Sequence, residues 1–525
     1  MASQPSLVKR VGVVGSGIAG LVAAYELAAL GHQVMLFEQQ PRPGGKVHQE
    51  SVAGQWIDSG PTVMTMRWVF DDLLGQSGHR LDDLMTLRPL DVLARHHWPD
   101  GSQLDLFTDL DRSHQAVAEF AGPAEAAAFD QLMAQAREVY HRLEPIYMRG
   151  QRPDLIGMTQ QLGLSGLALL TRLGPLQSLA RHLDRRFRDP RLRQLFARYA
   201  TYCGGSPWLA PATLMLIAYV ESRGVWAIEG GMQSLATGLA RGFEEIGGQL
   251  LLQTPVTRLR HRSGQIIGLE ARINGQDSQS FDFDAVVFNG DLRALSQAGL
   301  LDEPRPTIPR QQTEPSSLSA MTWSAVGEVQ GFGLHYHNVF FQPNYAEEFS
   351  SIFEQGRLPR EPTVYLCAQD RYGDPAGQSD SLGRPERLFL LINAPASQPG
   401  QTAPSLQEID QCQQRVFSRL ADAGLKIQLT EPARVKTPAD FGRLFPGSRG
   451  ALYGRAPHGW MSVFHRASSR SPIRHLYLAG GSVHPGAGVP MAGLSGRLAV
   501  ASLMEDLGLT RKSPRVVISG GMSMA

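Results

Sequence analysis

The chain has 525 residues, which is too long for one simple hydrophobic core, so two or three domains are expected. It has 50 Lys and Arg against 49 Asp and Glu, and this balance gives no indication of a nucleic-acid partner. The three cysteines are far apart, which argues against a disulfide framework or a zinc site. The short polar start lacks the apolar core of a signal peptide, and no run of 18 apolar residues occurs, so we expect a cytoplasmic protein without a membrane-spanning helix.

A glycine-rich turn near the start of the chain predicts a dinucleotide site. An apolar run at 11–14 precedes the turn, a helical pattern at 18–30 follows it, and a second apolar run at 34–37 ends on Glu38. Strand, glycine turn, helix, strand and acid in this order place pyrophosphate at the helix N-terminus. The acid at the end of the second strand suits a ribose 2′-hydroxyl and argues against NADP. The residues of the turn are Gly15, Ser16, Gly17, Ile18, Ala19 and Gly20. The alternative is a chance glycine turn between a strand and a helix.

A second glycine-rich loop follows Glu38 directly. Residues 39–46 hold two prolines, the pair Gly44 and Gly45, and the basic residues Arg42 and Lys46, so a loop is predicted where a simple NAD-binding unit would continue as a helix. This pattern indicates a longer dinucleotide that the chain contacts again. A solvent-exposed loop with two ordinary basic residues is the alternative.

A third glycine-rich stretch lies more than 450 residues later. The apolar strand at 476–479 leads into a glycine-rich loop at 480–488, and a helix of small residues is expected from Met491 to Leu507. A second helix start with small residues allows close approach to a planar or anionic ligand. A dinucleotide whose far end is a flavin would use such a second contact.

Two patterns between these motifs leave alternatives open. The leucine-rich stretch from Leu155 to Phe187 carries interleaved arginines, which fits a segment on an anionic membrane surface, although an internal helix pair with a basic outer face fits it too. His335 and His337 are two residues apart and would face one side of a strand. No third ligand stands nearby, so a structural role is favoured and no metal site is expected.

Taken together, these stretches resemble the flavin-dependent carotenoid desaturases, the bacterial phytoene desaturase family of the amine oxidase-like flavoproteins. The resemblance covers nearly the whole chain and is carried by residues 15–20, Glu38, 42–46, 58–62 and 484–490. The glycine turn is common to many FAD proteins, whereas the His-Pro-Gly-Ala-Gly-Val-Pro loop at 484–490 is much more specific. Residues 60–70 and 489–492 look like the branch named 1-hydroxycarotenoid 3,4-desaturases or methoxyneurosporene dehydrogenases.

The resemblance implies an α/β fold: a Rossmann-like FAD-binding domain with an inserted α+β substrate domain and a helical membrane-associating region. We expect the FAD-binding domain in three pieces, 8–80, 226–300 and 436–508. A region with both substrate-binding and helical membrane-associating parts would span 81–225, and the sheet of the substrate domain 301–435, with a flexible tail at 509–525. In many related proteins an acid follows the glycine of the C-terminal strand and lies near the ribityl chain or pyrophosphate of the flavin. Here Gly480 is followed by Gly481 and Ser482, so backbone N–H groups would make more of the contacts with this part of the cofactor.

The resemblance also implies which residues contact FAD. Adenosine would lie by Glu38 and Val256, pyrophosphate by residues 15–20, and the flavin ring under the 484–491 loop. The full expected set is Gly15, Ser16, Gly17, Ile18, Ala19, Gly20, Glu38, Gln39, Arg42, Gly44, Gly45, Lys46, Gly60, Pro61, Thr62, Val256, Gly480, Gly481, Gly488, Val489, Pro490 and Met491.

The expected chemistry is the removal of two hydrogens from adjacent carbons of an acyclic carotenoid. His484 is the candidate catalytic residue, with a loop-shaping role as the alternative. Oxygen or a membrane quinone would reoxidise the flavin, and a lipid-soluble substrate implies peripheral attachment to the inner membrane. Three hypotheses stay open: a carotenoid desaturase, including a phytoene desaturase; another flavin oxidase of the same fold, acting on an amine or a porphyrinogen; and a non-catalytic carrier of prenylated proteins.

Overall fold

A parallel sheet assembled from distant parts of the chain organises the computed structural model, which describes residues 8–153, 157, 177–297, 299–301, 315–372, 382–397 and 405–509. Its strand order is β20-β13-β1-β2-β9, and every pair is parallel. The strands are β1 (Arg10–Val14), β2 (Gln33–Phe37), β9 (Gln249–Leu251), β13 (Ala285–Phe288) and β20 (Leu476–Leu478). Strands β1, β13 and β20 are short and mostly apolar, as expected for a sheet buried on both faces.

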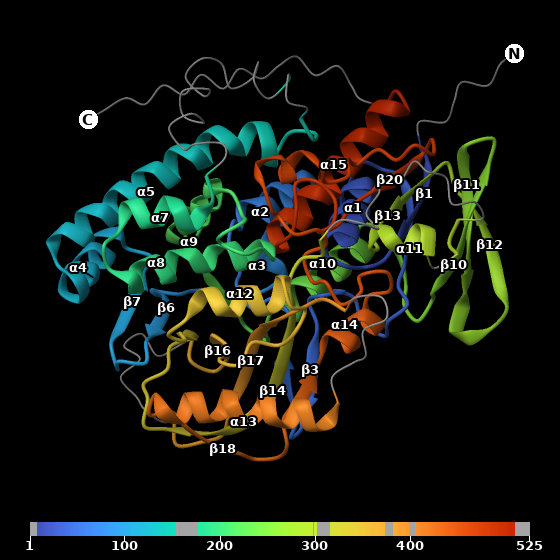
Figure 1. Cartoon of the computed structure of the whole chain (residues 1–525). Coiled ribbons are helices and arrows are strands. Elements are labelled where there is room, and N and C mark those ends of the chain that lie inside the picture. Colours follow the sequence, from blue (N-terminus) through green and yellow to red (C-terminus); the bar gives the residue numbers. More distant parts are fainter. Residues whose placement is uncertain are drawn as a thin grey trace, which may run out of the picture.

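Three helices accompany this sheet: α1 (Ile18–Ala29), α10 (Gln233–Glu245) and α15 (Val489–Asp506). Helices α1 and α15 come from opposite ends of the chain and lie side by side (Figure 1). Gly496 makes this contact possible, because a Cβ on it would stand 2.3 Å from the carbonyl oxygen of Ala19. The helix N-termini on either side of the expected cofactor are therefore locked to each other through backbone contact.

A second, mostly antiparallel sheet forms the lower part of the molecule (Figure 1). Its order is β18-β14-β17-β16-β15-β6-β7, with β19 also paired to β14. The strands are β6 (Val92–His97), β7 (Gln103–Phe107), β14 (Ser319–Gln330), β15 (His337–Phe340), β16 (Val364–Ala368), β17 (Glu386–Ala394), β18 (Lys426–Leu429) and β19 (Arg434–Lys436). The parallel pairing of β6 with β15 joins the 81–225 and 301–435 segments into one sheet, which the sequence motifs had assigned to separate regions.

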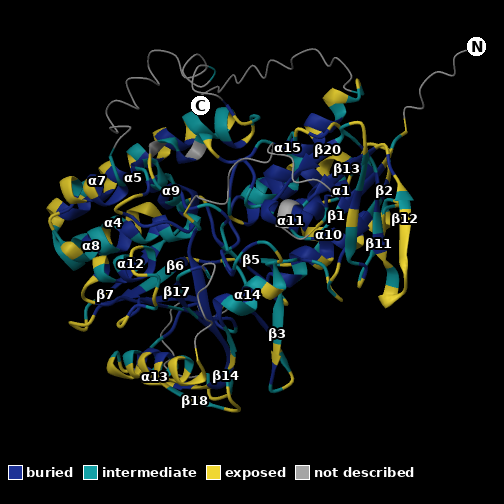
Figure 2. Cartoon of the chain, turned by 45° about the vertical axis from the view of Figure 1, so that its right-hand side comes forward, coloured by how far each residue is buried: buried dark blue, intermediate teal, exposed yellow. Residues whose placement is uncertain are grey.

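Helices cover this sheet and extend beside it. The long α13 (Leu406–Asp422) turns a buried side to the sheet and an exposed side to solvent (Figure 2). The others are α4 (Leu110–Ala121), α5 (Pro123–Leu143), α7 (Leu179–Arg186), α8 (Pro190–Ala197), α9 (Leu216–Ser222) and α12 (Tyr345–Phe353). Helices α4 and α5 are separated at Gly122, because a φ of +95° there and Pro123 interrupt the ladder of backbone hydrogen bonds.

Smaller elements complete the chain. A meander of β10 (Val256–Arg262), β11 (Gln265–Arg272) and β12 (Ser278–Asp282) projects at one side of the first sheet (Figure 1). Two further pairs join β3 (Gln49–Val52) to β4 (Gln55–Asp58) and β5 (Leu87–Pro89) to β8 (Trp226–Ile228). The remaining short helices are α2 (Trp68–Leu74), α3 (Leu81–Leu84), α11 (Leu292–Gln297) and α14 (Pro438–Leu444).

The leucine- and arginine-rich stretch is described only in part. Residues 154–156 and 158–176 lie outside the described residues, so the membrane-surface hypothesis for them stays a prediction. In the described part, Leu179 and Leu183 of α7 are fully buried, and Arg186 donates hydrogen bonds to Gln131 and Gln135 of α5. Helix α7 therefore fits the internal-helix alternative. Across the described ranges, we find no helix that is both long and apolar enough to span a bilayer.

We expect Gly496→Ala to destabilise the protein by about 1–3 kcal/mol, because the new methyl group overlaps the backbone of α1. Thermal unfolding of the flavin-loaded protein measures the effect. Gly493→Ala on the same helix is the control, because its Cβ would meet only side-chain atoms, the nearest at 3.3 Å. Equal melting temperatures for both variants would contradict the backbone contact.

Candidate functional site

The glycine turn between β1 and α1 leaves no room for side chains. Gly15 has a φ of +91°, and a Cβ on Gly20 would stand 2.0 Å from the carbonyl oxygen of Gly15. Helix α1 starts after Gly17 with neither a side-chain cap nor an acid in its first turn. Its first backbone N–H groups are thus available to an anionic ligand, as the sequence pattern predicts.

Glu38 at the end of β2 is tied to this turn. Its carboxylate accepts hydrogen bonds from the backbone N–H and the hydroxyl of Ser16, both at 2.8 Å, and from the N–H of Gln40 at 2.8 Å. The carbonyl oxygen of Glu38 accepts from the N–H of Thr254 at 2.7 Å, which brings the start of β10 at Val256 beside it. The acid and Val256, 218 positions apart, therefore lie at the same corner of the site.

Asn289, which the motif analysis did not include, holds the turn from the other side. Its side-chain amide donates to the carbonyl oxygens of Gly15 at 3.0 Å and Gly17 at 3.3 Å. A Cβ on Gly480 would stand 2.9 Å from the amide oxygen of Asn289, so the C-terminal strand ends against the same residue. The available sequence signal was its position directly after β13, at the carboxyl edge of a parallel strand.

The second glycine loop packs directly on the first. The N–H of Gly44 donates to the carbonyl oxygen of Ser16 at 2.8 Å, and a Cβ on Gly45 would be 3.1 Å from the Cα of Gly17. Lys46 points inward and donates to the carbonyl oxygen of Leu452 at 2.6 Å. Burial lowers the pKa of Lys46, while the nearby Asp291 acts in the opposite direction. A desolvated ammonium group in this position suits a phosphate or another electron-rich part of a dinucleotide.

Two residues of this loop have contacts elsewhere. The guanidinium of Arg42 lies 3.8 Å from the centre of the Trp56 ring on β4, and the side chain of Gln39 is exposed and donates to the carbonyl oxygen of Leu444 at 3.5 Å. In this conformation neither side chain turns to the glycine turn. A cofactor contact from Arg42 or Gln39 stays a prediction.

The segment after β4 lies against the second loop. A Cβ on Gly60 would stand 2.0 Å from the carbonyl oxygen of Lys46, and Pro61 follows it. Thr62 is buried, and its hydroxyl lies 2.6 Å from the hydroxyl of Tyr365 on β16. Thr62 thus connects the expected flavin site to the second sheet.

The C-terminal loop is held by Arg466, a second residue that the motif analysis missed. Arg466 is buried and donates to the carbonyl oxygen of Gly481 at 2.6 Å. The N–H of Gly480 donates to the hydroxyl of Ser495 on α15. Helix α15 then begins with Val489, Pro490 and Met491 after Gly488, whose φ is +115°, and again no side chain caps the start. Both helices that approach the site therefore present free N–H groups.

His484 has the contacts of a loop-shaping residue. It is 2% exposed, its Nε2 lies 3.1 Å from the carbonyl oxygen of Gly150, and its ring packs edge-on against Tyr147 with 4.6 Å between the ring centres. The hydroxyl of Tyr147 donates to the carbonyl oxygen of Pro485 at 3.0 Å. Burial lowers the pKa of His484 to about 4, so the imidazole is neutral at pH 7. These contacts favour the structural alternative over a catalytic acid.

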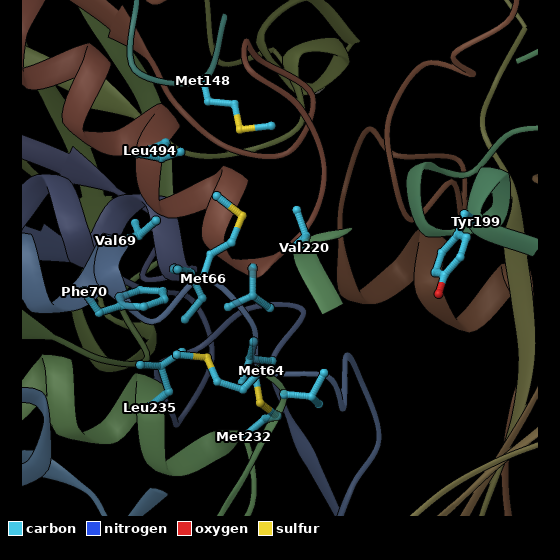
Figure 3. Close-up of a cluster of buried hydrophobic side chains, with 14 of the residues drawn as sticks. Met64, Met66, Val69, Phe70, Met148, Tyr199, Val220, Met232, Leu235 and Leu494 are labelled. Carbon is cyan, nitrogen blue, oxygen red and sulfur yellow. The ribbon is translucent and has the colours of Figure 1, made fainter. Parts of the chain in front are cut away.

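A methionine-rich apolar cluster borders the start of α15 (Figure 3). Val69 and Phe70 of α2 lie against Gly493, and a Cβ there would stand 3.3 Å from Val69. The labelled members are Met64, Met66, Val69, Phe70, Met148, Tyr199, Val220, Met232, Leu235 and Leu494. Unbranched methionine side chains adapt to irregular apolar ligands, so this apolar cluster suits a long hydrocarbon chain.

We expect acid to destabilise the fold in part through His484. Its pKa is about 4 when folded, against an ordinary value of 6.5, so between these values the unfolded chain binds more protons. Stability should therefore fall as the pH drops from 6.5 to 4, with His484 contributing as much as about 3 kcal/mol. Thermal unfolding across this pH range should give a shallower dependence for His484→Gln. An unchanged slope would contradict a buried neutral imidazole.

We expect Glu38→Gln to raise the dissociation constant for FAD about 10-fold or more, because charge-assisted hydrogen bonds at the turn are lost. Titration of the flavin-free protein with FAD measures this constant. Asp284→Asn is the matched control, since its carboxylate accepts from the N–H of Arg10 at the opposite end of β1. Equal affinities for wild type and Glu38→Gln would contradict the assigned role.

Comparison with known proteins agrees with this geometry. Residues 18–504 match the family model described as flavin containing amine oxidoreductase. The chain is 50% identical to a hydroxyneurosporene desaturase of Rubrivivax gelatinosus, over 99% of this chain and 98% of that protein. It is 42% identical to a hydroxyneurosporene desaturase of Cereibacter sphaeroides, over 95% and 98%. An oxidoreductase structure from Methanosarcina mazei covers 94% of this chain and 100% of its own with a TM-score of 0.58 and 15% identity, which shows the shared fold.

The residues present fit FAD. Two helix starts without side-chain caps and a glycine turn that a single Cβ would fill suit the phosphates, and the acid at the end of β2 suits a ribose. The half-buried Lys46 suits a further part of the dinucleotide. The family match and this fit identify the cofactor as FAD. The chain belongs to the flavin containing amine oxidoreductase family and, within it, to the carotenoid desaturases, which are FAD-dependent oxidoreductases acting on CH–CH bonds.

Proposed function

We propose that this protein introduces the 3,4 double bond into an acyclic 1-hydroxy- or 1-methoxycarotenoid of the neurosporene or lycopene type. The observation that carries the proposal is the 50% identity over nearly the full length to a relative named hydroxyneurosporene desaturase. The apolar cluster beside α15 supports it, because a long hydrocarbon chain needs an apolar surface next to the cofactor. Phytoene desaturation is the second candidate.

The reaction removes two hydrogens from adjacent saturated carbons. FAD supplies, when bound, the acceptor for the hydride from one carbon, and a proton leaves the neighbouring carbon. The carbon that loses the hydride is next to the polyene, which spreads the developing positive charge and lowers the need for a strong protein base. This agrees with a neutral, buried His484. The protein's contribution is to orient the chain and to exclude water with its buried methionines.

We also propose peripheral attachment to the inner membrane, since the substrate dissolves in lipid. Helix α7 buries its leucines, so the attachment would depend on other surfaces or on the part of the 155–186 stretch outside the described residues. Either oxygen or a membrane quinone would regenerate the oxidised cofactor. Turnover in air without quinone, compared with turnover under anaerobic conditions with added quinone, distinguishes the two.

The test is turnover of 1-hydroxyneurosporene in liposomes by the full, FAD-loaded chain. We expect a product with a longer chromophore and a mass two hydrogens lower, detected by absorbance and mass spectrometry. Gly20→Val is the inactive control, because the glycine turn cannot close around a side chain. If phytoene is converted and the hydroxylated carotenoid is not, the second candidate replaces the first.

A further inference from the structure

A group of polar side chains stands inside the apolar part of the molecule, and the reaction described above does not use it. Arg198 and Tyr202 lie on the short 3₁₀ helix Arg198–Cys203, Glu221 lies near the end of α9, and Tyr365 lies on β16. We call these four residues the Arg198 cluster. Buried polar groups need partners, and a charged one needs them most.

Glu221 and Tyr202 form the fixed side of the Arg198 cluster. The hydroxyls of Tyr199 and Tyr202 each donate to Glu221 at 2.7 Å, one to each carboxylate oxygen. Glu221 is 8% exposed, and burial raises its pKa while Arg198 lowers it. The two tyrosines therefore hold the carboxylate in place, and of the two only Tyr202 also accepts a hydrogen bond from Arg198.

Arg198 has donors left over. Its guanidinium donates to the hydroxyl of Tyr202 at 3.2 Å and lies over the rings of Tyr202 and Tyr365, 5.2 and 5.7 Å from their centres. Among the residues that the structure describes, this is the one hydrogen bond that the guanidinium makes. An arginine side chain carries five N–H donors and no acceptor, and Arg198 is half-buried, so its remaining donors are open to water or to an oxygen of a ligand.

Arg198 is half-buried, and its guanidinium lies toward the second sheet, over the Tyr365 ring of β16. Burial lowers the pKa of His96 on β6 and of His337 on β15 to about 3, and the charge of Arg198 acts on both in the same direction. Both histidines are 3% exposed. The free donors of Arg198 are therefore next to the inner face of the second sheet.

The Arg198 cluster also adjoins the expected flavin site on two sides. The hydroxyl of Tyr365 lies 2.6 Å from that of Thr62, which follows Gly60 and Pro61. On the other side, Tyr453 follows Leu452, whose carbonyl oxygen accepts from Lys46. The ring of Tyr453 lies against Gly204, close to Tyr202 in the chain, because a Cβ there would be 2.6 Å from it.

We propose that Arg198, supported by Tyr202 and Tyr365, binds the oxygen on C1 of the carotenoid end group and so selects oxygenated substrates. This inference rests on the proposed function. A hydroxyl oxygen and a methoxy oxygen both accept hydrogen bonds, but a methoxy group cannot donate one, so a donor-only guanidinium serves both. C1 is two bonds from C3, and anchoring its oxygen beside Thr62 presents the 3,4 bond to the cofactor.

Binding of two substrates that differ only at C1 tests this inference. Dissociation constants for 1-hydroxyneurosporene and neurosporene are measured on the FAD-loaded chain in detergent or liposomes, by quenching of protein fluorescence. We expect wild type to prefer the hydroxylated compound at least about 10-fold, as a charge-assisted hydrogen bond would give. Arg198→Met should remove this preference, because it weakens the binding of the hydroxylated compound and leaves the binding of neurosporene unchanged. Tyr202→Phe should reduce it and serves if the arginine variant fails to fold.

Tyr199→Phe is the matched control. It removes the same kind of hydrogen bond to Glu221 as Tyr202→Phe, but no contact with Arg198, so the preference should remain. Equal affinity of wild type for both carotenoids would overturn the inference, and so would an equal loss of affinity for both carotenoids in Arg198→Met. So would a shift of the flavin spectrum or reduction potential in Arg198→Met with the preference unchanged. If wild type shows the preference but forms no new double bond, the proposed function fails and the binding site stands.

Discussion

The backbone of the first glycine turn is held from three sides, and the remainder of the site depends on this arrangement. Asn289 binds two of its carbonyl oxygens, Glu38 binds the N–H and hydroxyl of Ser16, and Gly44 donates to the carbonyl oxygen of Ser16. Each partner comes from a different strand end or loop. Because the carbonyl groups of the turn have these hydrogen-bond partners, its backbone N–H groups stay directed at the ligand, and no side chain lies between them and the ligand.

The C-terminal part of the chain also packs against this turn and against helix α1. Gly480 ends against Asn289, and Gly496 lets α15 rest on the backbone of α1. The contact between α1 and α15 therefore has little tolerance for added volume, since both sides are backbone. Between β2 and β9, and again between β13 and β20, the chain builds the second sheet, which places the hydroxyl of Tyr365 2.6 Å from that of Thr62. The second sheet and the glycine loops of the first sheet are thus connected through Thr62.

The polar groups near the reaction site divide into two kinds. His484 is neutral and satisfied by a backbone carbonyl, so it shapes the loop and leaves the redox chemistry to FAD. Arg198 remains charged and has donors to spare, so it can recognise an oxygen atom in an otherwise apolar surrounding. A desaturase needs little acid–base help from the protein, but it does need to choose which carbons lie at the cofactor. Positional control by one anchored oxygen meets that need.

The sequence alone determined the parts of this protein that follow from local chemistry. The glycine spacing of 15–20, the acid at Glu38 and the glycine-rich start of α15 predicted a Rossmann-like unit and a flavin dinucleotide, because tight turns and helix starts leave a strict residue pattern. The desaturase family was implied by the resemblance that the 484–490 loop carries, and the family match confirms it. Tertiary structure decided what depends on distant partners. Asn289 binds the carbonyl oxygen of Gly15, 274 positions before it, and Tyr365 of the Arg198 cluster meets Thr62, 303 positions before it, so no pattern in their own segments marks these contacts. The inward direction of α7 and the joining of β6 to β15 were likewise decided by packing, which local propensity does not encode.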